Sequence, residues 1–268
     1  MSEAMIQVRN LIKAYGDFVA VKDISFDVDE GEIFAFLGPN GAGKTTTIKI
    51  LTTLLKPTSG SVRLDGLDPS VEHNEARKRF GIVFQDPSLD DELTAYENMD
   101  FHGVLYHVPR KIRMERIESL LKLFELWDRR NDPVKQFSGG MKRRLEIARG
   151  LLHTPRIIFL DEPTLGLDPQ TRNQLWTHVK KLNEEERVTV FLTTHYMEEA
   201  ERVAQRIAII DHGKIVAQGS APELKAQTGA ETLEQAFLAL TGSTIRQEEA
   251  SSIDQMRNMA RAFRGNRR

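Results

Sequence analysis

The chain has no cysteine among its 268 residues and no long apolar segment. Without cysteine it can form no disulfide framework, no thiolate zinc site and no cysteine nucleophile. The longest unbroken apolar runs, residues 33–37 and 236–240, are five residues each, whereas about 20 are needed to cross a bilayer. The opening stretch has no basic start and no apolar run, so we expect no secretory signal.

Neither sign of charge dominates the sequence. Lysine and arginine number 37 and aspartate and glutamate 39, which leaves a formal net charge of −2. This balance argues against a dedicated nucleic-acid binder, which usually has a strong basic excess. Apolar residues make up 40% of the chain and charged residues 28%, which is typical of a globular protein with a substantial core.

The N-terminal part alternates in a way typical of β-strands. Residues 24–29 place an apolar side chain at every second position, which predicts a half-buried strand, and Ile6 and Val8 indicate a partner strand. A short apolar strand over 33–37 and a glycine-rich loop follow. We then expect a helix, ended by Pro57 and Gly60, with an apolar face of Ile48, Leu51, Leu54 and Leu55.

The middle of the chain, from about residue 90 to 136, predicts helices and loops and no strand. Its apolar side chains recur at helical spacing, namely Met114, Ile117, Leu120, Leu121 and Phe124. We expect an inserted helical subdomain over about residues 90–155.

Strand and helix then alternate again. A continuous apolar run at 157–160 and the largely apolar segments 188–192 and 207–210 predict strands, and long crossovers between them predict a parallel sheet with right-handed connections. Residues 211–214 predict a hairpin turn. The first crossover contains a helix whose apolar face is Leu175, Trp176, Val179 and Leu182.

Residues 38–45 match the phosphate-binding pattern G-x-x-x-x-G-K-[ST] between a strand and a helix. Glycines let several backbone N–H groups converge on one anion, and the helix adds its positive end. We expect Lys44 to reach the β- and γ-phosphates of a nucleotide and the Thr45 hydroxyl to bind Mg²⁺. The predicted nucleotide-binding residues here are Gly38, Pro39, Asn40, Gly41, Ala42, Gly43, Lys44, Thr45 and Thr46.

Two acids, Asp161 and Glu162, end the apolar strand at 157–160. In an open parallel sheet, ligands bind beyond the carboxyl ends of the strands. We expect Asp161 to hold Mg²⁺ through its water shell and Glu162 to orient the attacking water or accept its proton. Alone, the pair is equally compatible with a solvated turn; the phosphate-binding loop favours the functional interpretation.

A second glycine motif, Ser138-Gly139-Gly140, precedes a helix with an apolar face. Ser138 can cap this helix while the glycines expose N–H groups, which makes a second anion-binding helix start. Taken by itself, the motif also fits an ordinary helix cap.

Together these motifs resemble the ATP-binding-cassette (ABC) ATPases over about residues 5–240. Within that resemblance, Tyr15 is similar to the aromatic residue that stacks on adenine, and Gln85 to the glutamine that senses Mg²⁺ and the γ-phosphate. Asp168 is similar to the aspartate of the loop that contacts the facing subunit, and His195 to the switch histidine. Read singly, Tyr15, Gln85 and His195 would each be ordinary structural residues, and their order supports the family.

Residues 137–141 resemble the family's signature loop, with two departures. Phe137 and Met141 stand where leucine and glutamine are usual. These departures leave the phosphate contacts of Ser138, Gly139 and Gly140 intact and affect only polar contacts of the fifth position.

The resemblance implies an α/β fold of the P-loop NTPase class: a mostly parallel sheet with an N-terminal antiparallel β-subdomain and an inserted helical subdomain. Residues 1–242 would form the ATPase domain. Residues 243–268 would form a basic tail, since five arginines and no acid follow Asp254.

The resemblance also implies the partners. The cofactors would be ATP and Mg²⁺, with Lys44, Glu162 and His195 acting in hydrolysis and Thr45, Gln85 and Asp161 at the metal. A second subunit, identical or paralogous, would complete two ATP sites. A separate multi-span permease would dock near residues 86–105, at the cytoplasmic face of the membrane.

The segments 138–148, 194–200 and 232–242 resemble the ATPases of daunorubicin-type drug exporters, so we expect export of a drug or lipid-like cargo. A soluble ABC ATPase acting in translation or DNA repair is the alternative. Translation factors of this type usually carry two cassettes, and repair ATPases insert a long coiled coil that has no counterpart here.

Overall fold

The computed structural model describes residues 4–242, and its centre is a six-stranded sheet in the order β5-β6-β7-β3-β8-β9. Neighbours are parallel throughout except the β8–β9 hairpin, which confirms the expected parallel sheet and the turn at 211–214. The strands are β3 (Ile33–Leu37), β5 (Phe80–Val83), β6 (Ile157–Asp161), β7 (Thr189–Thr194), β8 (Arg206–Asp211) and β9 (Lys214–Gly219).

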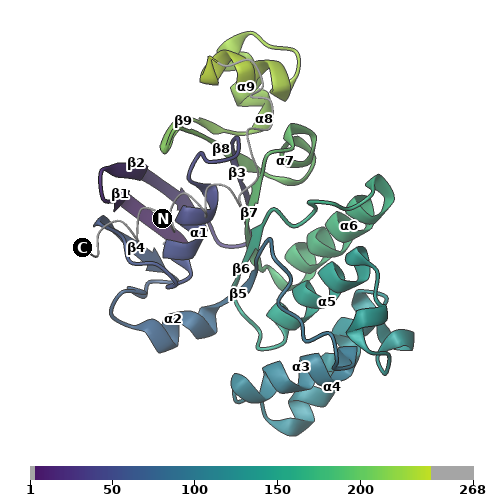
Figure 1. Cartoon of the computed structure of the whole chain (residues 1–268). Helices are drawn as coiled ribbons and strands as arrows, with labels where there is room; N and C mark the ends of the chain where they lie inside the picture. The colour runs from purple at the N-terminus through teal and green to yellow at the C-terminus, as the bar shows by residue number, and fades with distance from the viewer. Residues whose placement is uncertain (1–3, 243–268) are drawn as a thin grey trace, which may run out of the picture.

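A smaller antiparallel sheet, β2-β1-β4, lies beside the main sheet, together with helix α1 (Lys44–Leu51) (Figure 1). Its strands are β1 (Ile6–Tyr15), β2 (Phe18–Val28) and β4 (Ser59–Leu64). Phenylalanine rings join the two sheets: Phe26 of β2 lies 5.6 Å from Phe34 and 5.8 Å from Phe191, centroid to centroid. The alternating pattern at 24–29 is therefore confirmed as a strand with one face in the core. β4 was not expected from the sequence.

The helix after the phosphate-binding loop, α1 (Lys44–Leu51), is shorter than expected. Thr53 adopts a left-handed conformation with φ 64°, and the N–H groups of Leu54 and Leu55 both bond to the Lys49 carbonyl, so the chain turns off the helix there. Leu54 is 59% exposed and not part of the helix's buried face. The prediction that the helix runs to Pro57 was wrong.

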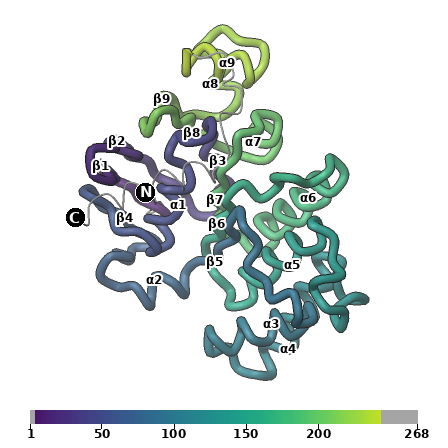
Figure 2. Tube along the Cα trace, viewed as in Figure 1, coloured from purple at the N-terminus to yellow at the C-terminus, as the bar shows by residue number. Residues whose placement is uncertain are grey.

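Helices fill the segment between β5 and β6, as expected, and lie on the opposite side of the main sheet from β1 and β2 (Figures 1 and 2). The face predicted for 114–124 is buried at Ile117, Leu120, Leu121 and Phe124, whereas Met114 is exposed, which corrects that assignment. The described helices are α2 (His73–Arg79), α3 (Ala95–Leu105), α4 (Arg110–Leu123), α5 (Gly139–Leu151), α6 (Pro169–Glu186), α7 (Met197–Val203), α8 (Ala221–Thr228) and α9 (Leu233–Thr241), with 3-10 turns at Trp127–Arg129 and Val134–Gln136.

Within residues 4–242, no helix has both the length and the apolar character to span a membrane. The predicted short helix at 232–242 is α9, with the Thr232 side chain capping its first turn and Gly242 ending it at φ 67°. The predicted basic tail, 243–268, lies outside the described residues, and the boundary at 242 stays a prediction.

A histidine pair sits where α3 and the end of α5 approach β5. The His153 ring stacks on Tyr106 at 3.9 Å, and the His102 ring lies 5.9 Å from His153. Burial, together with the charges of Arg149 and His153, lowers the pKa of His102 to about 3. Burial also lowers the pKa of His153 to about 4, against a hydrogen bond to the Phe80 carbonyl that raises it. Both rings are therefore neutral in the folded chain at pH values where they are protonated in the unfolded chain.

We expect the free energy of unfolding to fall as the pH drops below about 6.5. Below that pH the unfolded chain binds protons at His102 and His153, whereas the folded chain does not. At about pH 5, each of these two histidines has therefore lowered the free energy of unfolding by about 2 kcal/mol. The pH series of urea unfolding measures this. His102→Gln should remove the contribution of His102, about 2 kcal/mol of the acid loss, while the same change at exposed His73 should leave that loss intact. Equal acid sensitivity in both variants would contradict the assignment.

Candidate active site

The phosphate-binding loop joins β3 to α1 at the carboxyl end of the main sheet. Two of its glycines are required by close backbone approach. A side chain at Gly38 would overlap the Ile210 carbonyl, and at Gly43, where φ is 107°, a Cβ would lie 2.8 Å from the Ala20 carbonyl oxygen. The loop is therefore wedged between β2 and β8, which fixes where its N–H groups point.

Lys44 opens α1 and is only 4% exposed. Its Nζ donates to the carbonyls of Gly38 (2.7 Å) and Pro39 (3.1 Å) and lies 3.1 Å from Glu162 Oε1. Burial lowers the pKa of the Lys44 ammonium, and the charge of Glu162 opposes that shift. The cation is thus held inside the loop, with the carboxylate of Glu162 as its counter-ion.

Asp161 ends β6 and faces Thr45 and Thr193. Its Oδ1 accepts hydrogen bonds from Thr193 Oγ1 (2.6 Å) and Thr45 Oγ1 (3.3 Å). Its Oδ2 is buried and has no hydrogen-bond partner anywhere in residues 4–242, and burial raises the pKa of this carboxyl group. A free buried carboxylate oxygen beside a threonine hydroxyl fits a hard, oxygen-liganded cation such as Mg²⁺.

Glu162 follows in a left-handed conformation with φ 45°, which costs about 1–3 kcal/mol for a residue other than glycine. Its N–H donates to the Thr193 carbonyl (3.2 Å) and to Thr193 Oγ1 (3.0 Å). Its Oε2 lies 3.2 Å from His195 Nδ1. Burial raises the pKa of Glu162, but the proximity of His195 and the charge of Lys44 outweigh burial and lower it overall, so the group is ionised at neutral pH.

The order of strands in the main sheet explains why the phosphate-binding loop, the acid pair and His195 lie close together. Strand β7 lies between β3, which leads into the phosphate-binding loop, and β6, which ends in the acid pair. β7 contributes Thr193, and His195 follows directly after it. The structure therefore brings together the predicted Lys44, Thr45, Asp161, Glu162 and His195.

Other predicted residues stand apart from this cluster. Tyr15 ends β1 and is 42% exposed, with Lys13 Nζ 5.0 Å from its ring centroid. Gln85 lies exposed in the loop after β5. Across the described residues, no hydrogen bond or ion pair joins Tyr15, Gln85 or Ser138 to the Lys44–Glu162 cluster.

The second glycine motif begins α5. Ser138 Oγ accepts from the Met141 N–H at 3.2 Å, which confirms the predicted cap. Ser138 and Gly139 are exposed, and a side chain at Gly140 would overlap the Thr171 side chain. The start of α5 thus presents its N–H groups outward.

Thr171 joins this loop to Asp168 and was missed in the sequence. Its hydroxyl donates to Asp168 Oδ2 at 2.6 Å and its N–H to Asp168 Oδ1 at 3.0 Å, so Asp168 caps α6. The spacing of an aspartate, a proline and then Thr171 is typical of a helix start and was the available signal. The loop at 138–140 and the loop at Asp168 form one packed unit.

Glu199 of α7, which the sequence analysis did not identify, bonds to residues on both sides of the acid pair and His195. It is buried and accepts from Thr164 Oγ1 at 2.6 and 2.8 Å through its two oxygens, and from Thr194 Oγ1 at 3.3 Å. It therefore ties the turn after Glu162 to the strand end before His195.

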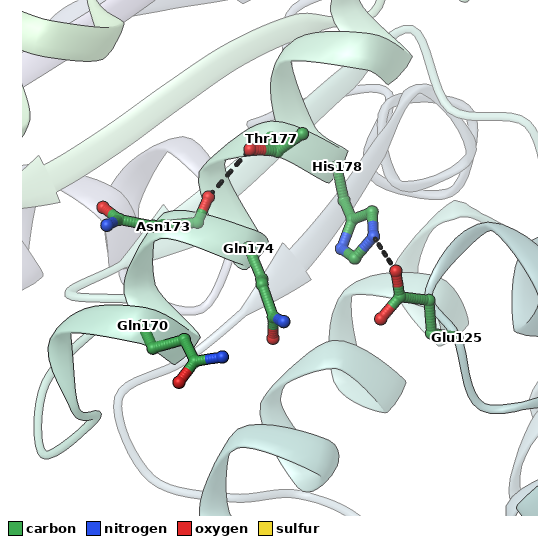
Figure 3. A pocket seen from close by; sticks show the side chains of 6 residues that line it. All are labelled: Glu125, Gln170, Asn173, Gln174, Thr177 and His178. Carbon is green, nitrogen blue, oxygen red and sulfur yellow. Dashed lines mark hydrogen bonds and ion pairs between the residues drawn. The ribbon is translucent and has the colours of Figure 1, made fainter.

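A separate polar pocket of about 560 Å³ lies along α6 (Figure 3). In it, His178 Nε2 lies 3.7 Å from Glu125 Oε1, and burial lowers the pKa of this histidine. None of the predicted site residues lines it; the lining residues are Glu125, Gln170, Asn173, Gln174, Thr177 and His178.

A phosphate-binding loop, an Asp–Glu pair two strands away and a second glycine motif on a capped helix define an ATPase of the ABC type. The family model described as "ABC transporter" matches residues 21–165, and the chain belongs to this family. It is an ATP-binding protein that hydrolyses ATP for transport, which confirms the family, the fold and the activity expected from the sequence.

Known proteins of this family resemble the chain over most of its length. A daunorubicin resistance ATP-binding protein of Streptomyces coeruleorubidus is 40% identical, covering 91% of this chain and 81% of its own. A linearmycin resistance ATP-binding protein of Bacillus subtilis is 42% identical, covering 85% and 73%. A solved ATP-binding subunit of an ABC transporter superposes with a TM-score of 0.80 at 29% identity, covering 88% of this chain and 99% of that one.

A second solved structure is informative about assembly. The ATP-binding cassette MJ0796, described as dimeric in a post-hydrolysis state with ADP and Pi, has a TM-score of 0.73 and 33% identity, covering 81% of this chain and 98% of that one.

Proposed function

We propose that two copies of this chain close around two ATP molecules, each site combining the phosphate-binding loop of one copy with the 138–140 loop of the other. The observation that carries this proposal is the exposed start of α5. Ser138 occupies the Met141 N–H, while the N–H groups of Gly139 and Gly140 have no acceptor within residues 4–242. Such N–H groups bind anions, and the dimeric cassette MJ0796 is a precedent for the pairing.

Each site residue has a separate role in phosphoryl transfer, a reaction that needs positioning and charge neutralisation more than covalent chemistry. Lys44 binds the β- and γ-phosphates, and its present ion pair with Glu162 shows that the two groups share one small volume. Glu162 orients the water and accepts its proton. His195, 3.2 Å from Glu162, holds that carboxylate in place.

The remaining predicted residues act at the edges of the nucleotide. Thr45 and Asp161, with Gln85, would hold Mg²⁺, which supplies charge neutralisation at the phosphates when bound. Tyr15 is exposed at the end of β1, where its ring is available for stacking on adenine. Asp168, packed to the 138–140 loop through Thr171, contacts the facing subunit.

The partner that uses the closing and opening of the dimer is a separate membrane permease, contacted at the cytoplasmic face. Support comes from large apolar side chains left exposed on α3, within the predicted docking stretch 86–105: Phe101, Val104 and Leu105. Contiguous exposed apolar residues mark interaction sites. We call these three side chains the α3 apolar patch.

Export of a drug-like or lipid-like molecule is the direction we favour. The relatives named above are resistance proteins, and another, at 41% identity, is a Nod factor export protein of Cupriavidus metallidurans. These names favour an exporter over a soluble ATPase acting in translation or DNA repair.

Purification from solubilised membranes tests the transport role. The chain is expected to bring down a multi-span membrane protein, and Phe101→Ser with Leu105→Ser is expected to lose it, because the α3 apolar patch no longer buries apolar surface. Val71→Ser, at another exposed apolar position, is the matched control and should retain it. If wild type brings down no membrane protein, the role is refuted; if the double variant retains it, the docking surface is wrong.

A further inference from the structure

Arg143 lies on α5, five residues after Ser138, and its side chain is buried. Its guanidinium donates to three backbone carbonyls of the turn that contains Asp161 and Glu162. Nε donates to the Pro163 carbonyl at 2.7 Å, and Nη2 donates to the carbonyls of Asp161 and Glu162 at 3.1 Å each. Three successive carbonyls of one turn therefore share one planar cation.

This contact is placed where the backbone is strained. Glu162 has φ 45°, and such a conformation persists only when surrounding groups over-determine it. Thr193 binds the Glu162 N–H, and Arg143 binds its carbonyl and the carbonyls on either side. The direction in which Glu162 points is thus set jointly by β7 and by α5.

The same guanidinium reaches the loop that contains Gln85. Nη1 donates to the Phe84 carbonyl and lies 3.1 Å from Glu146 Oε2. Glu146 in turn accepts the Ser88 N–H at 2.7 Å, so both sides of Gln85 are bonded to α5. Every N–H group of Arg143 has an acceptor.

We propose that Arg143 is a positioning residue that couples the 138–140 loop, at the start of its own helix, to the strained turn presenting Glu162 and to the Gln85 loop. This inference rests on the proposed dimer, in which the 138–140 loop of one subunit completes the site of the other. Closure on one nucleotide moves α5, and α5 moves the acid pair of the same subunit, which serves the second nucleotide. The two ATP sites therefore communicate through the body of each subunit.

Arg143→Lys tests the coupling, because lysine keeps the charge but cannot bond several carbonyls in one plane. We expect kcat for ATP to fall about 10-fold or more, with KM changed by less than about threefold and the Hill coefficient for ATP falling toward one. ATP-dependent dimers, measured by size exclusion in an additional Glu162→Gln background, should persist, since the N–H groups at 138–140 are untouched.

Arg116→Lys is the matched control. Arg116 also donates to backbone carbonyls of α5, those of Leu151 (2.9 Å) and Leu152 (2.8 Å). These carbonyls lie at the C-terminal end of the helix, far from the 138–140 loop. Arg116→Lys should lower the thermal midpoint without changing the Hill coefficient. If Arg143→Lys does not fold, the double variant Arg143→Gln with Glu146→Gln, which removes both members of the buried ion pair together, takes its place with the same expectations.

The outcomes separate the coupling from the dimer itself. If wild type forms no ATP-dependent dimer, the proposed function and this inference both fail. If wild type dimerises and hydrolyses ATP cooperatively but Arg143→Lys keeps kcat within twofold, or keeps the Hill coefficient, only the coupling is refuted. An equal loss of cooperativity in Arg116→Lys would also refute it, since a general loosening of α5 would then be the cause.

Discussion

Replacing Glu162 with glutamine is expected to abolish ATP turnover while leaving ATP-dependent dimers in place. Glutamine has nearly the same shape but cannot accept a proton, and loss of a general base lowers kcat by about 10²–10⁴-fold. The exposed N–H groups at 138–140 are unchanged, so closure on ATP persists and reopening fails. Phosphate release and size exclusion with ATP measure the two effects on one sample.

The variant needs a charge control because it also removes the counter-ion of buried Lys44. Glu198→Gln removes an exposed carboxylate of α7 near His195 and should keep the wild-type rate. Equal turnover in Glu162→Gln and wild type would remove Glu162 from its role as base. Loss of ATP binding in Glu162→Gln would instead show that its main task is to hold Lys44.

The residues of this site that could be predicted lie in short, continuous sequence motifs. The phosphate-binding loop and the acid pair each follow an apolar strand directly, and parallel pairing brings the ends of such strands to one edge. His195 directly follows β7, which pairs in parallel with β3 and β6, so it lies at the same edge of the sheet. The meeting of Lys44, Glu162 and His195 within 3.1–3.2 Å is thus a consequence of strand order.

The residues that sequence reasoning missed act across long separations. Arg143 stands between Lys142 and Arg144, and nothing in the local sequence distinguishes its buried guanidinium from these two partly exposed basic neighbours. Its partners lie 18 to 20 residues away at Asp161–Pro163 and 59 away at Phe84. Only the folded sheet brings them together.

Errors at element ends have a similar origin. The apolar side chain of Leu54 fits the helical period, yet α1 ends at Leu51 because Thr53 turns left-handed and sends the chain toward β4. Tertiary pairing of β4 with β1 overrides a local pattern that would continue the helix.

Two inactive variants are expected to restore activity when mixed. Lys44→Ala removes the phosphate-binding cation, and Ser138→Arg places a bulky cation at the exposed loop that completes the facing site; each should lower kcat by at least about 10²-fold. In a mixed dimer, the intact phosphate-binding loop of the Ser138→Arg subunit meets the intact 138–140 loop of the Lys44→Ala subunit. That dimer contains one complete site.

The recovered rate should be at most about a quarter of wild type, since about half of randomly paired dimers are mixed and each holds one complete site of two. Coupling between the two sites would lower it further. Lys44→Ala mixed with Glu162→Gln is the matched control and should recover nothing, because Lys44 and Glu162 belong to the same half of a site and no pairing yields both. Steady-state phosphate release over a series of mixing ratios distinguishes the two mixtures, with a maximum near equal amounts only in the first. A flat series in both mixtures would contradict a nucleotide site shared between two subunits, and the exposed N–H groups of Gly139 and Gly140 would then have some other ligand.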